Sequence, residues 1–310
     1  AISLRTMTTK LKELFREDWE WELRDNPEFA YQAGQYDIAQ KGIPLQSVSD
    51  ASYKKRSEHS KEMIEKLDVI VKEAGSSLDA QHTLFADLFR KMHVELSEFI
   101  DKYPLYLLGI NSTGVGCVTF SLIETVEWMR FENLHDYEVY LRMLGHFHIQ
   151  VEETIECLRA GKARGYVASS AITHNVEAQL DEIISGDLSE LKQPLTTPTA
   201  ASVLADAPEL RQSIESAVEN TRVGFRAFLT FFRDEYKAWL VASPACSSLP
   251  DGAAAYAACL RFHTTTELSA EEIHAMGLKE VERIEARLAD EVLAPLGLPP
   301  SAAGERPGPL

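Results

Sequence analysis

The sequence lacks the features that mark several large classes of protein. It has 31 Lys and Arg against 48 Asp and Glu, a formal net charge of −17. It therefore has no basic surplus to displace counterions from a nucleic acid, and its charge disfavours docking on anionic membranes. No segment reaches the roughly 18 uninterrupted apolar residues that a membrane-spanning helix needs. We expect neither nucleic acid nor membrane as a partner.

Cysteine is also scarce. Four cysteines lie far apart and form no C-x-x-C pair, so a disulfide framework is not indicated: Cys117, Cys157, Cys246 and Cys259. In a chain of 310 residues this is typical of free thiols in a reducing compartment. The N-terminus becomes charged too early for a secretion signal. We therefore favour a cytoplasmic location.

The common catalytic motifs are missing as well. Helical zinc peptidases use H-E-x-x-H, two imidazoles one turn apart and a Glu that activates water, but none of the nine histidines precedes a Glu. The nearest substitute pairs His148 with Glu152 at i, i+4, and a solvated polar face is the simpler interpretation. No G-x-S-x-G elbow is present, and residues 114–116 lack the third Gly of a dinucleotide loop. We assign no catalytic, cofactor-binding or metal-binding residue.

What the sequence does contain is helical periodicity. Apolar residues at helical spacing predict helices over 6–24, 49–74, 78–100, 136–144, 147–160 and 168–184. The first three could form an antiparallel bundle. The predicted inner stripe of the third helix is Leu84, Leu88, Met92, Leu96 and Phe99. Residues 103–120 are apolar but not helix-periodic, and they predict either a strand-like excursion or a buried loop.

The C-terminal part contains one long helix and one clearly marked helix start. From a cap at Asp206, an aromatic apolar stripe runs to Trp239 and predicts a spine helix of about 35 residues, ~50 Å long. Ser269 and Glu272 form a capping-box signature that starts a helix over 269–292. The Thr-, Ser- and Pro-rich segment 186–205 predicts a long loop and is the candidate for a sub-boundary. The fold class is all-α, a multi-helix bundle.

This helical region spans residues 1–292. Residues 293–310 are rich in Pro and Gly and predict a disordered tail.

A polar cluster precedes the last predicted helix. His263, Thr264, Thr265 and Thr266 follow a run of small and apolar residues at a hinge between two helices. Side chains of this kind either cap local backbone or line a cleft. The residues alone leave both interpretations open.

Three stretches resemble segments of the family called domain of unknown function 885, and they occur in the same order as in that family. They are N-P-E-F-A-Y-Q-A-G-Q-Y-D over 26–37, the segment 136–167, and D-G-A-A-A-Y-A-A-C-L-R-F-H-T-T-T with the helix that follows it, over 251–284. The resemblance covers roughly residues 10–290. It implies a predominantly helical, gluzincin-like fold, as in zinc metallopeptidases and their relatives.

By that resemblance, Tyr256, His263, Thr264 and Thr265 would face the substrate cleft. The family's zinc motif, of the form H-E-x-x-P-G-H-H-x-Q, follows the third stretch and is absent from this sequence. We therefore expect no cofactor in this chain, and zinc only with a missing C-terminal half.

Three hypotheses of function follow. The first is the N-terminal, substrate-cleft portion of a metallopeptidase-like protein that hydrolyses peptides, inactive alone. Its partners would be a peptide or small-molecule substrate, and its missing C-terminal half or a second copy of itself. The second is a non-catalytic helical binding module, and the third, the weakest, is an enzyme with an unfamiliar site around His263. If a second half normally covers the helices over 206–240 and 269–292, this chain exposes their apolar faces.

Overall fold

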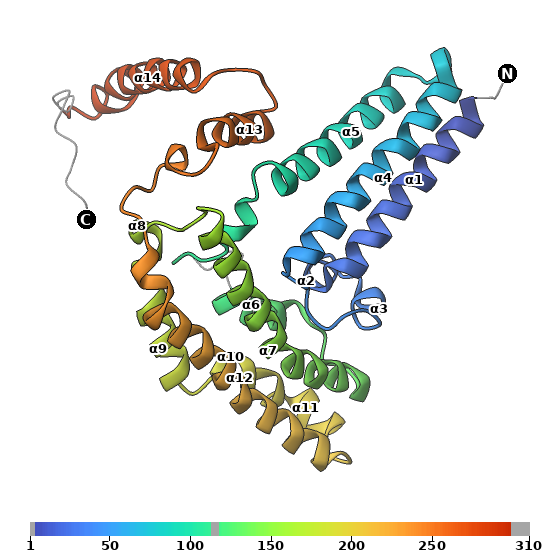
Figure 1. Ribbon diagram of the computed structural model, residues 1–310, viewed down its shortest axis with the longest axis vertical. Helices are drawn as coiled ribbons and strands as arrows, with labels where there is room; N and C mark the ends of the chain where they lie inside the picture. The colour runs from blue at the N-terminus through green and yellow to red at the C-terminus, as the bar shows by residue number, and fades with distance from the viewer. Residues whose placement is uncertain (1–3, 113–117, 299–310) are drawn as a thin grey trace. The chain divides into compact units, whose positions relative to one another are not determined.

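The computed structural model describes residues 4–112 and 118–298 (Figure 1). All regular secondary structure in these ranges is helical, apart from one isolated parallel bridge between Ser169 and Val241. The predicted all-α class is confirmed. The chain divides into two compact units, Ala1–Gly252 (unit 1) and Ala253–Leu310 (unit 2), and segment 186–205 lies within unit 1. Across the described ranges, no helix is long and apolar enough to cross a membrane.

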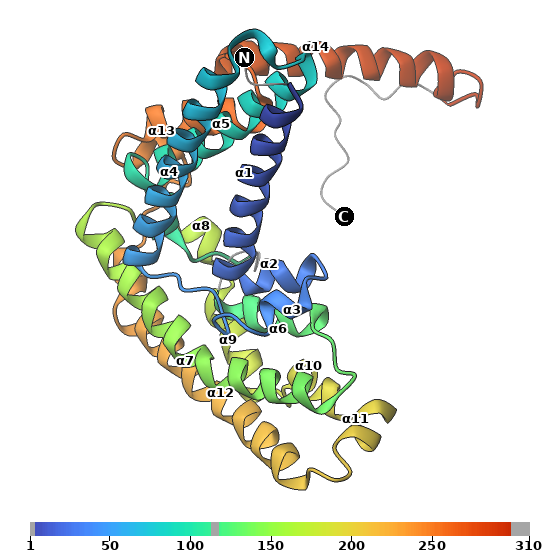
Figure 2. The ribbon, with the colours of Figure 1, turned by 90° about the vertical axis from the view of Figure 1, so that its right-hand side faces the viewer.

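Unit 1 begins with three long helices that run alternately up and down beside one another (Figures 1 and 2): α1 (Leu4–Asp25), α4 (Asp50–Ala74) and α5 (Ala80–Asp101). Side-chain caps fix where two of them start. The Ser49 hydroxyl accepts from the Ser52 N–H, and the Asp79 carboxylate accepts from the His82 N–H. Their apolar core consists of Leu11, Leu14, Met63, Leu67, Ala86 and Phe89.

The buried face of α5 is not the predicted one. Leu84, Leu88 and Met92 are 56%, 52% and 47% exposed. The buried residues are Ala86, Phe89, His93 and Ile100. Helix α5 carries apolar residues on two faces, and hydrophobic periodicity alone does not choose between them.

A polar network inside the bundle makes that choice. Nε2 of His59 lies 2.8 Å from one carboxylate oxygen of Asp18, and Nε2 of His93 lies 3.3 Å from the other. The Trp21 ring stacks on His59 at a centroid distance of 3.7 Å. Burial acts to raise the pKa of Asp18, but the interactions of its carboxylate with both histidines outweigh it and lower this pKa to about 2. The network ties α1, α4 and α5 together and turns His93 inward.

The larger core surrounds two helices that lie side by side, α7 (Leu134–Ala163) and α12 (Pro208–Asp234) (Figures 1 and 2). Helix α7 starts with a capping box between Asn133 and Asp136. It is one helix of 30 residues where the sequence predicted two, because packing of Phe147 and its neighbours outweighs the weak helix propensity of Gly145. Gly224 lets α12 approach α7 closely, since a Cβ there would lie 3.0 Å from Cε1 of Phe147.

The spine helix is shorter than predicted. Helix α12 has 27 residues, starts after Ala207 rather than at an Asp206 cap, and gives way to the 3-10 turn η4 (Tyr236–Trp239). The tighter turn carries Tyr236 into the core, where its hydroxyl accepts a hydrogen bond from the Ala168 N–H at 3.0 Å. The predicted inner face is correct: its buried members are Ile214, Thr221, Phe225, Phe228, Phe232 and Tyr236.

Short elements complete unit 1. They are α2 (Pro27–Gln32), α3 (Tyr36–Ala39), η1 (Gly75–Ser77), η2 (Leu105–Leu108), α6 (Val118–Trp128), α8 (Ser170–Thr173), α9 (Val176–Ser185), α10 (Ser189–Lys192), η3 (Gln193–Leu195), α11 (Pro198–Val203) and η5 (Cys246–Ser248). Segment 186–205 is therefore not the predicted long loop, because α10, η3 and α11 occupy it and bury Leu191, Leu195 and Ala200. In segment 103–120, η2 and the start of α6 are helical, and 113–117 lie outside the described residues.

Unit 2 contains α13 (Gly252–Thr264), α14 (Ala270–Arg287) and the π-helical turn η6 (Leu288–Leu293). The predicted capping box is confirmed. The Ser269 hydroxyl accepts from the Glu272 N–H at 3.2 Å, and the Glu272 carboxylate accepts from the Ser269 N–H at 2.8 Å. The large apolar residues of α14 and η6 are exposed from Met276 to Val292, whereas the inner face of α12 is buried. Of the predicted tail, residues 299–310 lie outside the described ranges.

The two faces of α5 can be told apart by paired substitutions. Phe89→Ala should lower the free energy of unfolding by about 3 kcal/mol, because it removes a buried ring from the bundle core. Leu88→Ala, one position away on the exposed face, should change it by less than about 0.5 kcal/mol. Urea unfolding followed by circular dichroism measures both. Equal losses would mean that the bundle does not use the Phe89 face.

Candidate functional site

A cavity of about 260 Å³ lies in unit 1 among α2, α4, α6 and α7. Its lining combines polar, acidic and aromatic side chains from segments far apart in the sequence: Asn26, Glu28, Gln46, Val48, Tyr53, Tyr106, Gly109, Ser121, Glu124, Thr125, Trp128, Gln150, Thr154, Cys157 and Leu158. Among the described residues, no Lys, Arg or His lines it. Pockets with an apolar frame and a few convergent polar groups are the usual ligand sites of proteins.

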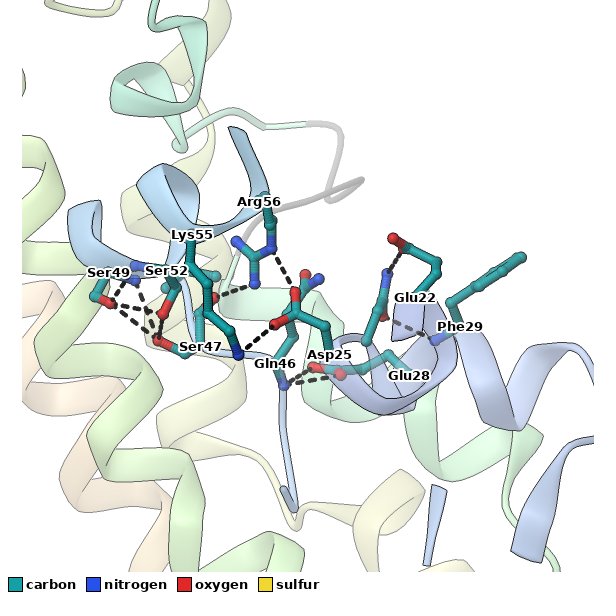
Figure 3. A network of polar contacts seen from close by, with 12 residues as sticks. Glu22, Asp25, Glu28, Phe29, Gln46, Ser47, Ser49, Ser52, Lys55 and Arg56 are labelled. Atoms are coloured by element: carbon teal, nitrogen blue, oxygen red, sulfur yellow. Dashed lines mark hydrogen bonds and ion pairs between the residues drawn. The ribbon is translucent and has the colours of Figure 1, made fainter. Parts of the chain in front are cut away.

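One wall of the cavity is an extended segment whose backbone bonds to side chains. The Gln46 N–H donates to both carboxylate oxygens of Glu28, at 2.9 and 3.0 Å (Figure 3). Nε2 of Gln150 donates to the Gln46 carbonyl at 3.1 Å and to Oε1 of Glu28 at 3.2 Å. Glu28 and Gln150 therefore come from different helices and together fix the peptide groups on both sides of Gln46.

The next residues of the segment are held in the same way. Glu153 accepts from the Val48 N–H at 2.8 Å and from the Ser47 hydroxyl at 2.9 Å. The Cys157 thiol donates to the Val48 carbonyl at 3.0 Å. The Arg56 guanidinium donates to the Ser47 carbonyl at 2.7 Å (Figure 3). The wall is thus a short extended strap, Gln46–Ser49, clamped from α2, α4 and α7.

Glu28 is the most electrostatically unusual group of the site. It lies in the first turn of α2, after the Asn26 cap and Pro27. Burial raises its pKa, although its own N–H, the Gln46 N–H, the Gln150 amide and the charge of Arg56 act to lower it. It forms no ion pair in the described residues, because Arg56, the nearby cation, donates to Asp25 at 2.6 Å (Figure 3). Its carboxylate is surrounded by protein and still reaches the cavity.

Glu124 is the second acidic group of the cavity. It projects from α6, is half-buried, and makes no hydrogen bond or ion pair within residues 4–112 and 118–298. A carboxylate can accept about four hydrogen bonds when ionised. Glu124 therefore offers the cavity an uncommitted acceptor.

Aromatic side chains form another part of the lining. The rings of Tyr53 and Tyr106 stack at a centroid distance of 3.9 Å. The Tyr106 hydroxyl donates to Asp50 at 2.5 Å, and the Arg56 guanidinium lies 4.8 Å from the Tyr53 ring centroid. Both rings are thus fixed by contacts outside the cavity, and Trp128 adds a third aromatic surface.

The residues predicted from the resemblance to line a cleft lie in unit 2. Tyr256 is 46% exposed and His263 is exposed. The Thr264 hydroxyl donates to the Leu260 carbonyl at 2.7 Å, so it caps local backbone, which is one of the two interpretations of this cluster. Thr265 adopts a left-handed conformation, with φ of 55°. Whether these four residues face a substrate stays a prediction.

The other candidates for chemistry remain scattered. His148 and Glu152 are both exposed on α7, and no three His, Cys, Asp or Glu side chains in the described residues come together in a way that could hold a metal ion. Burial raises the pKa of the Cys157 thiol to about 11, so this cysteine is a hydrogen-bond donor rather than a thiolate nucleophile. Cys246 and Cys259 are partly buried, and neither forms a disulfide with another described residue.

Sequence reasoning missed the residues of this cavity, although two signals pointed to them. Glu28 belongs to the stretch 26–37, and Gln150, Glu153 and Cys157 belong to 136–167. Both stretches carry the family resemblance, and the structure brings them together at the Gln46–Ser49 strap. Nothing in the sequence marks Glu124.

Comparison with known proteins gives a family and a fold. A family model described as "Bacterial protein of unknown function (DUF885)" matches residues 27–297. No curated protein matches the chain. The crystal structure of "the putative lipoprotein from Colwellia psychrerythraea" is similar, with a TM-score of 0.64 and 18% identity, over 96% of this chain and 52% of that one. The chain thus spans about half the length of that structure, and the likeness extends to the fold alone.

The raised pKa of Glu28 predicts how stability responds to pH. Ionising this carboxyl is harder in the folded protein than in the unfolded chain, so the wild type loses stability as the pH rises above the ordinary value of 4.5. The neutral amide of Glu28→Gln does not share that loss. Relative to wild type, the variant should gain stability between pH 4 and pH 7.5, measured by urea unfolding.

Glu65→Gln is the matched control, because Glu65 is exposed on α4. It should show no comparable gain over the same pH range. If Glu28→Gln instead lost stability relative to wild type as the pH rose, the buried carboxylate would be favoured by its surroundings, against the direction derived above.

Proposed function

The chain belongs to the DUF885 family of bacterial proteins, and from this premise we propose that it is the substrate-holding region of a peptide-hydrolysing protein. Its site is the cavity between α2, α4, α6 and α7. The observation that carries the proposal is the pair of carboxylates, Glu28 and Glu124, that reach this cavity without a cationic partner in the described residues. Uncompensated, partly buried charges cluster at functional sites.

The role assigned here is binding, not bond cleavage. The sequence holds no H-E-x-x-H, and the described residues offer no group of three side chains that fits zinc. We therefore assign to this chain the binding and orientation of a peptide. The zinc that the family resemblance implies would be held by residues other than those described.

The size and lining of the cavity suit a short segment of peptide. A volume of about 260 Å³ lies just below the range of roughly 300–1,000 Å³ that is typical of ligand pockets, so one or two residues would fill it. Gln46, Gln150 and the two carboxylates would orient the polar backbone of such a ligand. Tyr53, Tyr106 and Trp128 would cover its apolar atoms.

A second candidate is a helical binding module that works without hydrolysis at any stage. It uses the same cavity, whose lining offers groups that bind a ligand. The two candidates differ in whether a longer protein containing this region cleaves the peptide that the cavity binds. Both require the cavity to bind peptide.

A cavity-filling variant tests that requirement. The purified chain should bind trialanine in isothermal titration calorimetry and leave it intact, with or without added zinc. Ser121→Phe places a ring in the cavity and should weaken binding at least tenfold. Glu127→Phe places the same ring on the exposed side of α6 and should leave binding unchanged.

Thermal unfolding of both variants checks that they remain folded. Equal binding by Ser121→Phe and wild type would remove the cavity from the proposal. Zinc-dependent cleavage of trialanine by the purified chain would overturn the assignment of binding alone.

A further inference from the structure

We propose that this cavity recognises a primary ammonium group, presented by the amino terminus of a short peptide or by an equivalent free amine. The inference rests on the proposed function and adds to it the chemical group that the site selects. It follows from the charges of the lining, the way Glu28 is held, and the aromatic walls.

The first argument is charge. Several acidic side chains elsewhere in unit 1 pair with bases: Arg233 lies 2.8 Å from Glu177 and 2.6 Å from Asp181, and Lys237 lies 2.7 Å from Glu177. The cavity lining contains two carboxylates and, in the described part of the chain, no basic side chain. Charges enclosed by protein interact more strongly than charges in water. The cavity therefore attracts a cation.

The second argument is the geometry of Glu28. One of its oxygens accepts from both the Gln46 N–H and the Gln150 amide, whereas Oε2 accepts only from the Gln46 N–H. The carboxylate is thus held in one orientation and keeps acceptor capacity on Oε2. Burial raises the pKa of Glu28, and a bound cation would offset the desolvation responsible.

The third argument separates an ammonium group from a metal ion. A bound divalent cation needs several ligands in close coordination, and no third acidic or imidazole side chain joins Glu28 and Glu124 in the described residues. An ammonium group instead carries three N–H donors, and the lining offers acceptors for them in Oε2 of Glu28, in the Glu124 carboxylate and in its neutral oxygens. The stacked Tyr53 and Tyr106 rings and Trp128 add faces on which a cation or its attached carbons can lie.

Arg56 does not already fill this role. Its guanidinium donates to Asp25 at 2.6 Å and to the Ser47 carbonyl at 2.7 Å (Figure 3). The nearest basic side chain of the network is therefore committed to its own partners. The cavity carboxylates are left for a ligand.

Acetylation of the ligand tests the inference. Titration calorimetry near pH 7 compares trialanine with N-acetyl-trialanine, which has no ammonium group. Wild type should bind trialanine at least tenfold more tightly. Glu124→Gln should lose most of that preference, whereas Glu127→Gln, exposed three residues further along α6, should retain it.

The pH dependence gives a readout that needs no variant. An α-amino group has a pKa of about 8, so raising the pH from 7 to 9 should weaken trialanine binding roughly tenfold. An alkyl amine such as 1,4-diaminobutane, with a Lys-like pKa of about 10.4, should keep its affinity over that range. Binding of the diamine with the same dependence on Glu124 supports a free amine as the source. Binding of trialanine without the diamine supports a peptide amino terminus.

Two negative results have different meanings. Equal affinity of wild type for trialanine and its acetylated form overturns ammonium recognition and leaves peptide binding standing. Failure of wild type to bind either peptide overturns the proposed function itself.

Discussion

The strap Gln46–Ser49 is the constraint on which the rest of unit 1 depends. Buried backbone donors and acceptors without partners cost about 1–3 kcal/mol each. This strap has no helix or sheet to pair with, so Glu28, Arg56, Gln150, Glu153 and Cys157 supply the partners. These side chains come from α2, α4 and α7. Satisfying the strap therefore joins the N-terminal bundle to the α7–α12 core and leaves the cavity beside it.

Much of the helical framework could be predicted, because it depends on local signals. The Ser269–Glu272 capping box and the inner face of α12 follow from residues within one or two turns of each other. The predictions failed where distant contacts decide. The face of α5 is set by His93 and its contact with Asp18 of α1, and α7 continues through Gly145 because tertiary packing favours it. Periodicity carries no information about either contact.

The site was harder to predict than the fold for a related reason. Its lining comes from positions as distant in the sequence as Glu28, Tyr53, Glu124 and Gln150, so no motif with a fixed spacing predicts it. The stretches that resemble the family do contain Glu28 and Gln150. The resemblance alone does not explain why Glu28 and Gln150 stand at these positions. Their hydrogen bonds to the backbone of Gln46 give a structural reason. Glu124 carries no signal, since an isolated Glu on a helix is usually a solvated surface residue.

The two carboxylates that hold the strap differ in a way that bears on function. Glu153 uses one oxygen for the Val48 N–H and the other for the Ser47 hydroxyl, so the strap uses both of its oxygens for different partners. Glu28 could hold Gln46 and Gln150 with Oε1 alone, as the carbonyl of a neutral Gln would. A negative charge at this position therefore costs desolvation that the strap does not require. A cation that enters the cavity would explain why this position carries a charge. It would also explain why a second carboxylate, Glu124, lies in the same lining.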